Sequence, residues 1–134
     1  MPILPIDTGR YGTVEMRRIF EEENRLQKLI GVEAALAWAH GEVGNIPRKD
    51  AEKIVEMASV RHVKISRVKE IESEIKHDIT ALVRALSEVC GSSGAYVHFG
   101  ATSSDILDTA TTLQLKEATS LIARRLYDLE AVLI

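Results

Sequence analysis

The chain has 134 residues and a net charge of −3, with 46% hydrophobic and only 4% aromatic residues. This length suits one domain with one ordinary core, and a weakly acidic chain has no general attraction for nucleic acid or anionic lipid. No stretch approaches the roughly 18 apolar residues of a membrane-spanning helix, so we expect neither a nucleic-acid partner nor a membrane partner.

Residues 1–12 are predicted to be irregular, because they contain two prolines and Gly12. Helix is predicted over residues 14–43, in one or two pieces, since apolar residues recur there at steps of three and four. Thr13 can cap its start. Gly44 and Pro47 end it, and a short helix over residues 48–58 follows.

Two further helices are predicted in the middle of the chain, over residues 64–73 and 78–90, from apolar positions that share one helical face. The glycines and serines of residues 91–94 predict a flexible linker. Residues 96–99 are expected to be extended and half-buried before Gly100 interrupts them. The chain is therefore predicted to be all-α.

The last element is predicted to be one long helix that Ser103 or Ser104 caps, with Asp105 and Asp108 near the positive end of its dipole. Its apolar stripe continues to Ile134 without a stop signal. At about 1.5 Å per residue, such a rod is roughly 45 Å long, more than the rest of a small domain can cover. We therefore expect either contacts with other chains or a longer natural polypeptide. The predicted division is a helical domain over residues 1–103 and the start of a second over residues 104–134.

Four polar segments lack an obvious core or solvent role, and three of them lie at predicted helix starts. A helix start offers free N–H groups and partial positive charge, which suits a phosphate or carboxylate. Two histidines could donate protons or hydrogen bonds near neutral pH. Together they suggest a site for a small polyanion. The four segments are Arg10–Tyr11, Lys76–His77–Asp78, His98, and Thr102–Ser103–Ser104–Asp105.

Each segment also has a purely structural interpretation. Asp78 can be only the N-cap of its helix, with Lys76 and His77 solvated, and spacing alone favours this alternative. His98 can be a half-buried histidine with a satisfied hydrogen bond, and the 102–104 hydroxyls can be only a cap. His40 is expected to be solvated. The single cysteine, Cys90, has no partner for a disulfide or a metal, so no metal site and a reducing, cytoplasmic compartment are expected.

The segment 97–110, Val-His-Phe-Gly-Ala-Thr-Ser-Ser-Asp-Ile-Leu-Asp-Thr-Ala, is similar to the first conserved region of the fumarase/aspartase superfamily of lyases. Within that superfamily the chain resembles the adenylosuccinate lyase family. The further matches are Arg10–Tyr11, residues 76–79, residues 22–25 and Glu33. Their order and spacing hold across the whole chain.

The resemblance implies an all-helical N-terminal domain followed by a long helix that joins the central bundle of a homotetramer. It implies elimination of fumarate from adenylosuccinate, which leaves AMP, and from the succinyl-carboxamide ribotide of purine biosynthesis, without a metal or organic cofactor. In that reaction a base removes a proton beside a carboxylate and an acid protonates the departing nitrogen. The site must therefore hold a phosphate and two carboxylates in place.

The resemblance also assigns roles to individual residues. His98 matches an active-site histidine on the phosphate side, and His77, considered as a proton donor in the family, is assigned here to substrate binding and electrostatics. The family's Thr-His motif and its mobile Gly-Ser-Ser-x-x-Pro loop have no counterparts before Ile134, so we expect an N-terminal fragment that is inactive alone. The positions that match substrate-contacting residues are Arg10, Tyr11, Lys76, His77, Asp78, His98, Thr102 and Ser103.

Two alternatives remain open at this point. A sister lyase or cycloisomerase of the same superfamily, acting on argininosuccinate or a carboxymuconate, would share the 102–103 region, although Arg10–Tyr11 and residues 76–78 argue against it. A non-catalytic helical module would use the same polar residues as caps and the apolar stripe of its last helix as an interface.

Overall fold

A computed structural model describes residues 11–134, and all regular structure in that range is helical. This confirms the all-α prediction. The elements are α1 (Val14–Phe20), α2 (Glu22–Glu42), α3 (Arg48–Met57), α4 (Ile65–Ile75), α5 (Asp78–Cys90), the 3-10 helix η2 (Gly91–Tyr96) and α6 (Ser103–Leu133).

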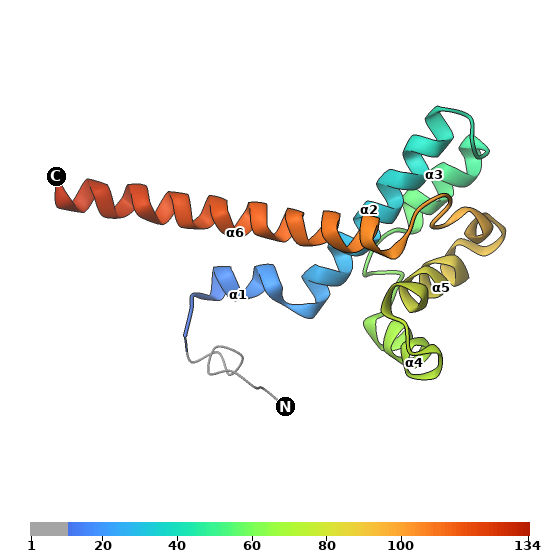
Figure 1. Cartoon of the computed structure of the whole chain (residues 1–134), viewed down its shortest axis with the longest axis horizontal. Helices are drawn as coiled ribbons and strands as arrows, with labels where there is room; N and C mark the ends of the chain where they lie inside the picture. Colours follow the sequence, from blue (N-terminus) through green and yellow to red (C-terminus); the bar gives the residue numbers. More distant parts are fainter. Residues whose placement is uncertain (1–10) are drawn as a thin grey trace.

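Helices α2 to α5 form a cluster from which α6 projects as a long rod, and α1 runs beside that rod (Figure 1). Helix α2 packs against both α3 and α6, while α4 packs against α5. The connections from α2 to α3 and from α4 to α5 are short, so the two helices of each pair lie side by side. The helices of the cluster and the first turns of α6 thus share one core.

The predicted helix over residues 14–43 comes in two pieces, which meet at an extended residue, Glu21. The break leaves the Ile19 carbonyl without a helical partner, and two side-chain amides satisfy it. Asn24 Nδ2 donates at 2.8 Å and Gln114 Nε2, from the buried face of α6, donates at 2.7 Å. Because a carbonyl shielded from water is costly to leave unpaired, this pair of bonds helps to hold the junction of α1 and α2 against α6.

The core is built from the periodic apolar residues of four helices. Ile30 of α2, Ile54 of α3, Leu86 of α5 and Ile106 of α6 are at most 1% exposed. Burying a side chain of this size stabilises the fold by about 1.5–3 kcal/mol. The core therefore holds the helix ends that carry the candidate site in fixed relative positions.

The predicted linker over residues 91–94 is wrong. These residues form the start of η2, and Ser93 and Gly94 are buried. Ser93 Oγ donates to Asp50 Oδ1 of α3 at 2.7 Å, and Gly94 lies against the backbone of Ser87 in α5. The small residues let η2 pack closely against α3 and α5, and they do not form a flexible linker.

The extended segment predicted over residues 96–99 is also not observed. Tyr96 ends η2, Val97 has extended dihedrals, and His98 has a left-handed φ of 63°. The tight turn that follows ends at Gly100, whose φ is 71°. A strand pattern of alternating burial is absent from residues 96–99, because the chain turns back at once into α6.

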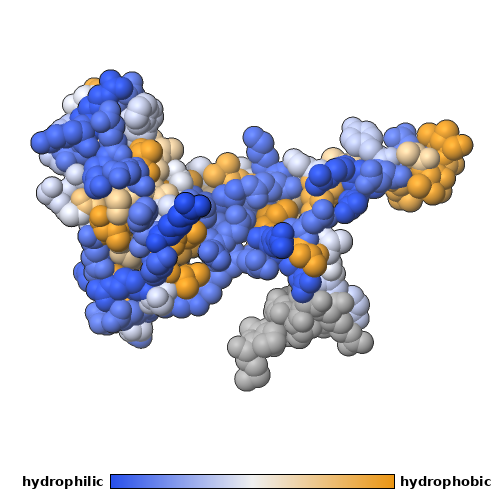
Figure 2. Space-filling view, turned by 180° about the vertical axis from the view of Figure 1, so that it is seen from behind, coloured by the Kyte–Doolittle hydropathy of each residue, from blue (hydrophilic) through white to orange (hydrophobic). Residues whose placement is uncertain are grey.

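Helix α6 has 31 residues, and its apolar side chains are uncovered beyond Leu121. Hydrophobic side chains gather at its far end (Figure 2); they include Leu126, Leu129, Val132 and Leu133, which are between 52% and 82% exposed. This confirms the predicted stripe. No helix within residues 11–134 combines the length and hydrophobicity needed to cross a bilayer.

Candidate functional site

The turn between η2 and α6 presents His98. Its ring Nδ1 lies 2.7 Å from Oε1 of Glu33, a carboxylate of α2. The His98 side chain is 21% exposed, while that of Glu33 is fully buried. The hydrogen bond to the buried Glu33 therefore ties His98 to the core, while part of the His98 side chain reaches the surface.

Glu33 lies on the buried stripe of α2, in line with Leu26, Ile30 and Ala37. Burial raises the pKa of its carboxyl, and the hydrogen bond with His98 opposes that shift. Its second oxygen, Oε2, is buried and has no hydrogen-bond partner among residues 11–134. Sequence reasoning did not assign Glu33 to the site. A charged residue in the middle of an apolar stripe is the signal that could have found it.

The turn after His98 packs on the C-terminal half of α2. The Phe99 ring meets His40 edge-on, with ring centroids 5.3 Å apart, and His40 Nδ1 lies 2.9 Å from the side-chain amide of Asn45. The expectation that His40 is solvated is wrong: it is half-buried and supports the turn.

A second polar turn joins α4 to α5 and carries residues 76–78. Lys76 ends α4 with a left-handed φ of 55°. His77 is the N-cap of α5, and its Nδ1 accepts a hydrogen bond from the Thr80 N–H at 3.3 Å. The predicted N-cap, Asp78, is instead the first helical residue, and its Oδ1 accepts from the Ile79 N–H at 2.7 Å. All three side chains are exposed at the positive end of α5.

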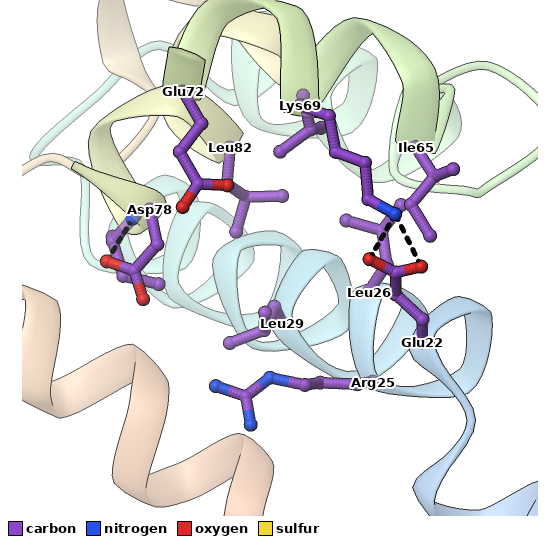
Figure 3. Close-up of a pocket in the computed structure, with 11 residues that line it drawn as sticks. Glu22, Arg25, Leu26, Leu29, Ile65, Lys69, Glu72, Asp78 and Leu82 are labelled. Carbon is purple, nitrogen blue, oxygen red and sulfur yellow. Dashed lines mark hydrogen bonds and ion pairs between the residues drawn. The ribbon is translucent and has the colours of Figure 1, made fainter. Parts of the chain in front are cut away.

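Asp78 also stands at the rim of a pocket of about 270 Å³ between α2, α4 and α5. Figure 3 shows an apolar floor that includes Leu29 and Leu82, with the carboxylates of Glu72 and Asp78 at one end and an ion pair between Lys69 and Glu22 at the other. The pocket can accept an apolar group whose polar substituents reach the rim.

The start of α6 carries the third polar group. Thr102, rather than Ser103 or Ser104, is the N-cap, and the Asp105 carboxylate accepts a hydrogen bond from the Thr102 N–H at 2.9 Å. Ser103 is half-buried and Thr102 is exposed. The hydroxyls stand at the positive end of a 31-residue helix, a favourable place for an anion.

The predicted site residues fall into two groups. His98 and residues 102–103 share one turn, which the hydrogen bond from the Ala101 N–H to the His98 carbonyl closes at 3.3 Å. Residues 76–78 form the other group, and no hydrogen bond or ion pair within residues 11–134 joins the two. Tyr11 is exposed just before α1, and Arg10 lies outside the described residues. No cluster of metal-ligating side chains occurs in the described part of the chain.

A family model described as "Lyase" matches residues 9–133. The chain belongs to this lyase family. It is 57% identical over 133 residues to an adenylosuccinate lyase of Pyrococcus abyssi and 53% identical over 135 residues to one of Methanocaldococcus jannaschii; these alignments cover 99% and 100% of the chain but 29% of each relative. The crystal structure of a fumarate lyase from Mesorhizobium sp. BNC1 superposes with a TM-score of 0.77 at 34% identity, covering 86% of this chain and 28% of that one.

These likenesses confirm the resemblance inferred from residues 97–110 and from the matches elsewhere. The chain spans about 29% of the length of the curated adenylosuccinate lyases it matches. The starts of α5 and α6 place hydroxyl, ammonium and imidazole groups at the surface of this chain. Such groups can bind phosphate or carboxylate oxygens and stabilise charge that builds up on them.

The buried carboxyl of Glu33 predicts a pH-dependent stability. Its pKa is higher in the folded protein than the reference value of 4.5, so the folded state holds the proton more tightly and ionisation costs stability as pH rises through the folded pKa. We expect the unfolding free energy of the unmodified protein, relative to Glu33→Gln, to rise as pH falls from about 7 towards about 5. Urea unfolding at several pH values measures this.

The surface carboxylates of Glu56 and Glu88, whose pKa values are lowered by Lys53 and Arg67 respectively, are present in both proteins and cancel in the difference. If the unfolding free energy of the unmodified protein, relative to that of Glu33→Gln, fell with decreasing pH, the raised pKa of Glu33 would be contradicted.

Proposed function

We propose that this chain supplies the N-terminal helical domain, residues 1–103, and the start of the central helix, residues 104–134, of an adenylosuccinate lyase. The enzyme would eliminate fumarate from adenylosuccinate to leave AMP, and from the succinyl-carboxamide ribotide. The observation that carries the proposal is the likeness to archaeal adenylosuccinate lyases over nearly the whole chain.

In this reaction the bond between carbon and nitrogen breaks after a base removes the proton beside a carboxylate, and the departing nitrogen takes a proton from an acid. The chain would contribute binding groups, with the ammonium of Lys76 and the ring of His77 at the start of α5 and the hydroxyls of Thr102 and Ser103 at the start of α6. His98 would contact the substrate on the side of its phosphate group. The acid and base that transfer protons would come from parts of the enzyme outside this chain.

The proposal extends to assembly and location. The apolar face of α6 beyond Leu121 is exposed, and burying it in a bundle with other copies would remove a large apolar area from water. A homotetramer built on this helix, located in the cytoplasm and working without a cofactor, fits the proposed enzyme.

Fumarate release tests the proposed function. Incubated with adenylosuccinate, this chain alone should form no fumarate, whereas a polypeptide that continues it to the length of its relatives should. Argininosuccinate and a carboxymuconate serve as parallel substrates. Turnover of either of these, with none of adenylosuccinate, would favour a sister enzyme of the fold, and no turnover of any substrate would favour a non-catalytic module.

Residues 76–78 provide a more specific prediction. In the longer polypeptide, Lys76→Ala or His77→Ala should raise KM for adenylosuccinate by about tenfold, because a charge-assisted hydrogen bond to the substrate is worth more than ~1 kcal/mol. Lys53→Ala, which removes an exposed lysine of α3 paired with Glu56, is the matched control and should leave KM unchanged. Equal KM values in all three variants would exclude the 76–78 turn from the binding site.

A further inference from the structure

His98 and His77 use the same ring nitrogen for opposite purposes. Behind His98, Nδ1 lies 2.7 Å from a carboxylate oxygen of Glu33. At the start of α5, the same atom of His77 faces the backbone N–H of Thr80 at 3.3 Å. Oδ1 of Asp78 lies 3.6 Å from this nitrogen, beyond hydrogen-bond distance, and accepts instead from the Ile79 N–H. An ionised carboxylate can only accept a hydrogen bond and a backbone N–H can only donate one. The two partners therefore demand different protonation of Nδ1.

We propose that Glu33 is a positioning residue that holds His98 as the Nδ1–H tautomer, so that its Nε2 presents a lone pair at the surface, while the N-cap bond holds His77 as the Nε2–H tautomer. The assignment of both histidines to a substrate site rests on the proposed function. The assignment of their tautomers does not, because it follows from the two hydrogen bonds alone.

Glu33 is well placed to impose this geometry. Its side chain is fully buried in the middle of α2, between turns that carry the core residues Ile30 and Ala37, so its carboxylate cannot follow a moving ring. The His98 backbone has a left-handed φ of 63°, a conformation that is unfavourable for a residue with a Cβ atom. The short hydrogen bond to Glu33 offsets part of that cost and fixes the ring direction.

The two tautomers give the two histidines complementary roles. Neutral His77 offers a donor, Nε2–H, to a ligand oxygen. Neutral His98 offers an acceptor, so a ligand hydroxyl can donate to it directly, whereas an anionic oxygen binds there only if Nε2 first takes one proton from solvent. Glu33 then compensates the charge of the imidazolium. Glu33 thus determines which chemical groups can approach His98.

Nitrogen-15 NMR of the 134-residue chain labelled at histidine tests the assignment without substrate. At about pH 8, above the ordinary histidine pKa near ~6.5, multiple-bond correlations to the ring protons identify the protonated nitrogen. We expect Nδ1–H for His98 and Nε2–H for His77. An Nε2–H signal for His98, or Nδ1–H for His77, would overturn the proposal in the unmodified protein.

Two variants separate the effect of Glu33 from general changes in the turn. Glu33→Leu removes the acceptor and should shift His98 away from the Nδ1–H form, while His77 keeps its signals. Asp50→Asn alters the carboxylate that accepts from Ser93 in η2, close in sequence to His98, and should leave both tautomers unchanged. Persistence of the Nδ1–H form in Glu33→Leu would show that Glu33 does not set it.

Kinetics in the longer polypeptide provides the functional readout. Glu33→Leu should raise KM for adenylosuccinate by about tenfold with a smaller change in kcat, because it alters how His98 binds rather than the proton-transfer groups. An unchanged KM would overturn the positioning role in binding. If the unmodified polypeptide forms no fumarate while the NMR result holds, the proposed function fails and the tautomer assignment stands.

Discussion

Replacing Gly94 with alanine is expected to lower the free energy of unfolding by about 3 kcal/mol. A Cβ placed on Gly94 would lie 2.5 Å from the carbonyl oxygen of Ser87 and 2.8 Å from its Cα. Both atoms belong to the backbone of α5, so no side-chain rotation can relieve the overlap. Either η2 moves away from α5 or the helix distorts. Urea unfolding followed by circular dichroism measures the loss.

Gly31→Ala is the matched control for Gly94→Ala. Gly31 lies in the middle of α2 and is exposed, and a Cβ at this position would meet open space, with no neighbouring atom within 4 Å. Alanine there should stabilise the protein by about 0.5–1 kcal/mol, because glycine loses more backbone entropy on entering a helix. Similar effects of the two substitutions would show that close packing between η2 and α5 does not limit stability.

The Gly94 contact also bears on the candidate site. Its carbonyl accepts hydrogen bonds from Ser87 Oγ at 3.0 Å and from the Val97 N–H at 3.2 Å. The second bond sets the direction in which the chain enters the His98 turn. Displacing η2 should therefore move His98 relative to Glu33, so we expect Gly94→Ala to weaken the proposed substrate binding as well as the fold.

The helices were predictable because their apolar residues recur at helical steps and because Gly44 and Pro47 mark an end and a start. Their order and approximate bounds follow from local information alone. The segment 91–100 was not predictable, since glycine and serine indicate flexibility locally, whereas their burial depends on how η2 packs against α3 and α5. Only the packed structure shows that Gly94 touches Ser87.

The candidate site, like the fold, was only partly predictable from the sequence. Residues 76–78 and 102–103 were identified because hydroxyl, basic and acidic groups at helix starts are a local pattern. The partnership of His98 with Glu33 spans 65 positions in the sequence, and no spacing rule connects them. The capping roles were also exchanged between neighbours, as His77 and Thr102 took the places expected of Asp78 and Ser103. Caps depend on the backbone dihedrals of one residue, which composition does not determine.

Leu86→Ala is expected to lower the free energy of unfolding by about 3 kcal/mol. Leu86 is 0% exposed in the core face of α5, so truncation removes apolar contacts and leaves a cavity that the surrounding helices cannot close. Leu126→Ala deletes the same atoms from the far part of α6, where the leucine is 60% exposed. In the dilute monomeric chain it should cost less than about 0.5 kcal/mol.

The same pair of variants distinguishes a solvated α6 from one that other copies cover. If α6 packs in a bundle, Leu126→Ala should weaken assembly, and its cost should grow with protein concentration, because association stabilises the folded state by mass action. Leu86→Ala should lower the free energy of unfolding by the same amount at every protein concentration, after correction for the contribution of association. Unfolding at two concentrations, together with light scattering, tests both statements. A Leu126→Ala cost that is large and independent of concentration would mean that α6 folds back on its own chain.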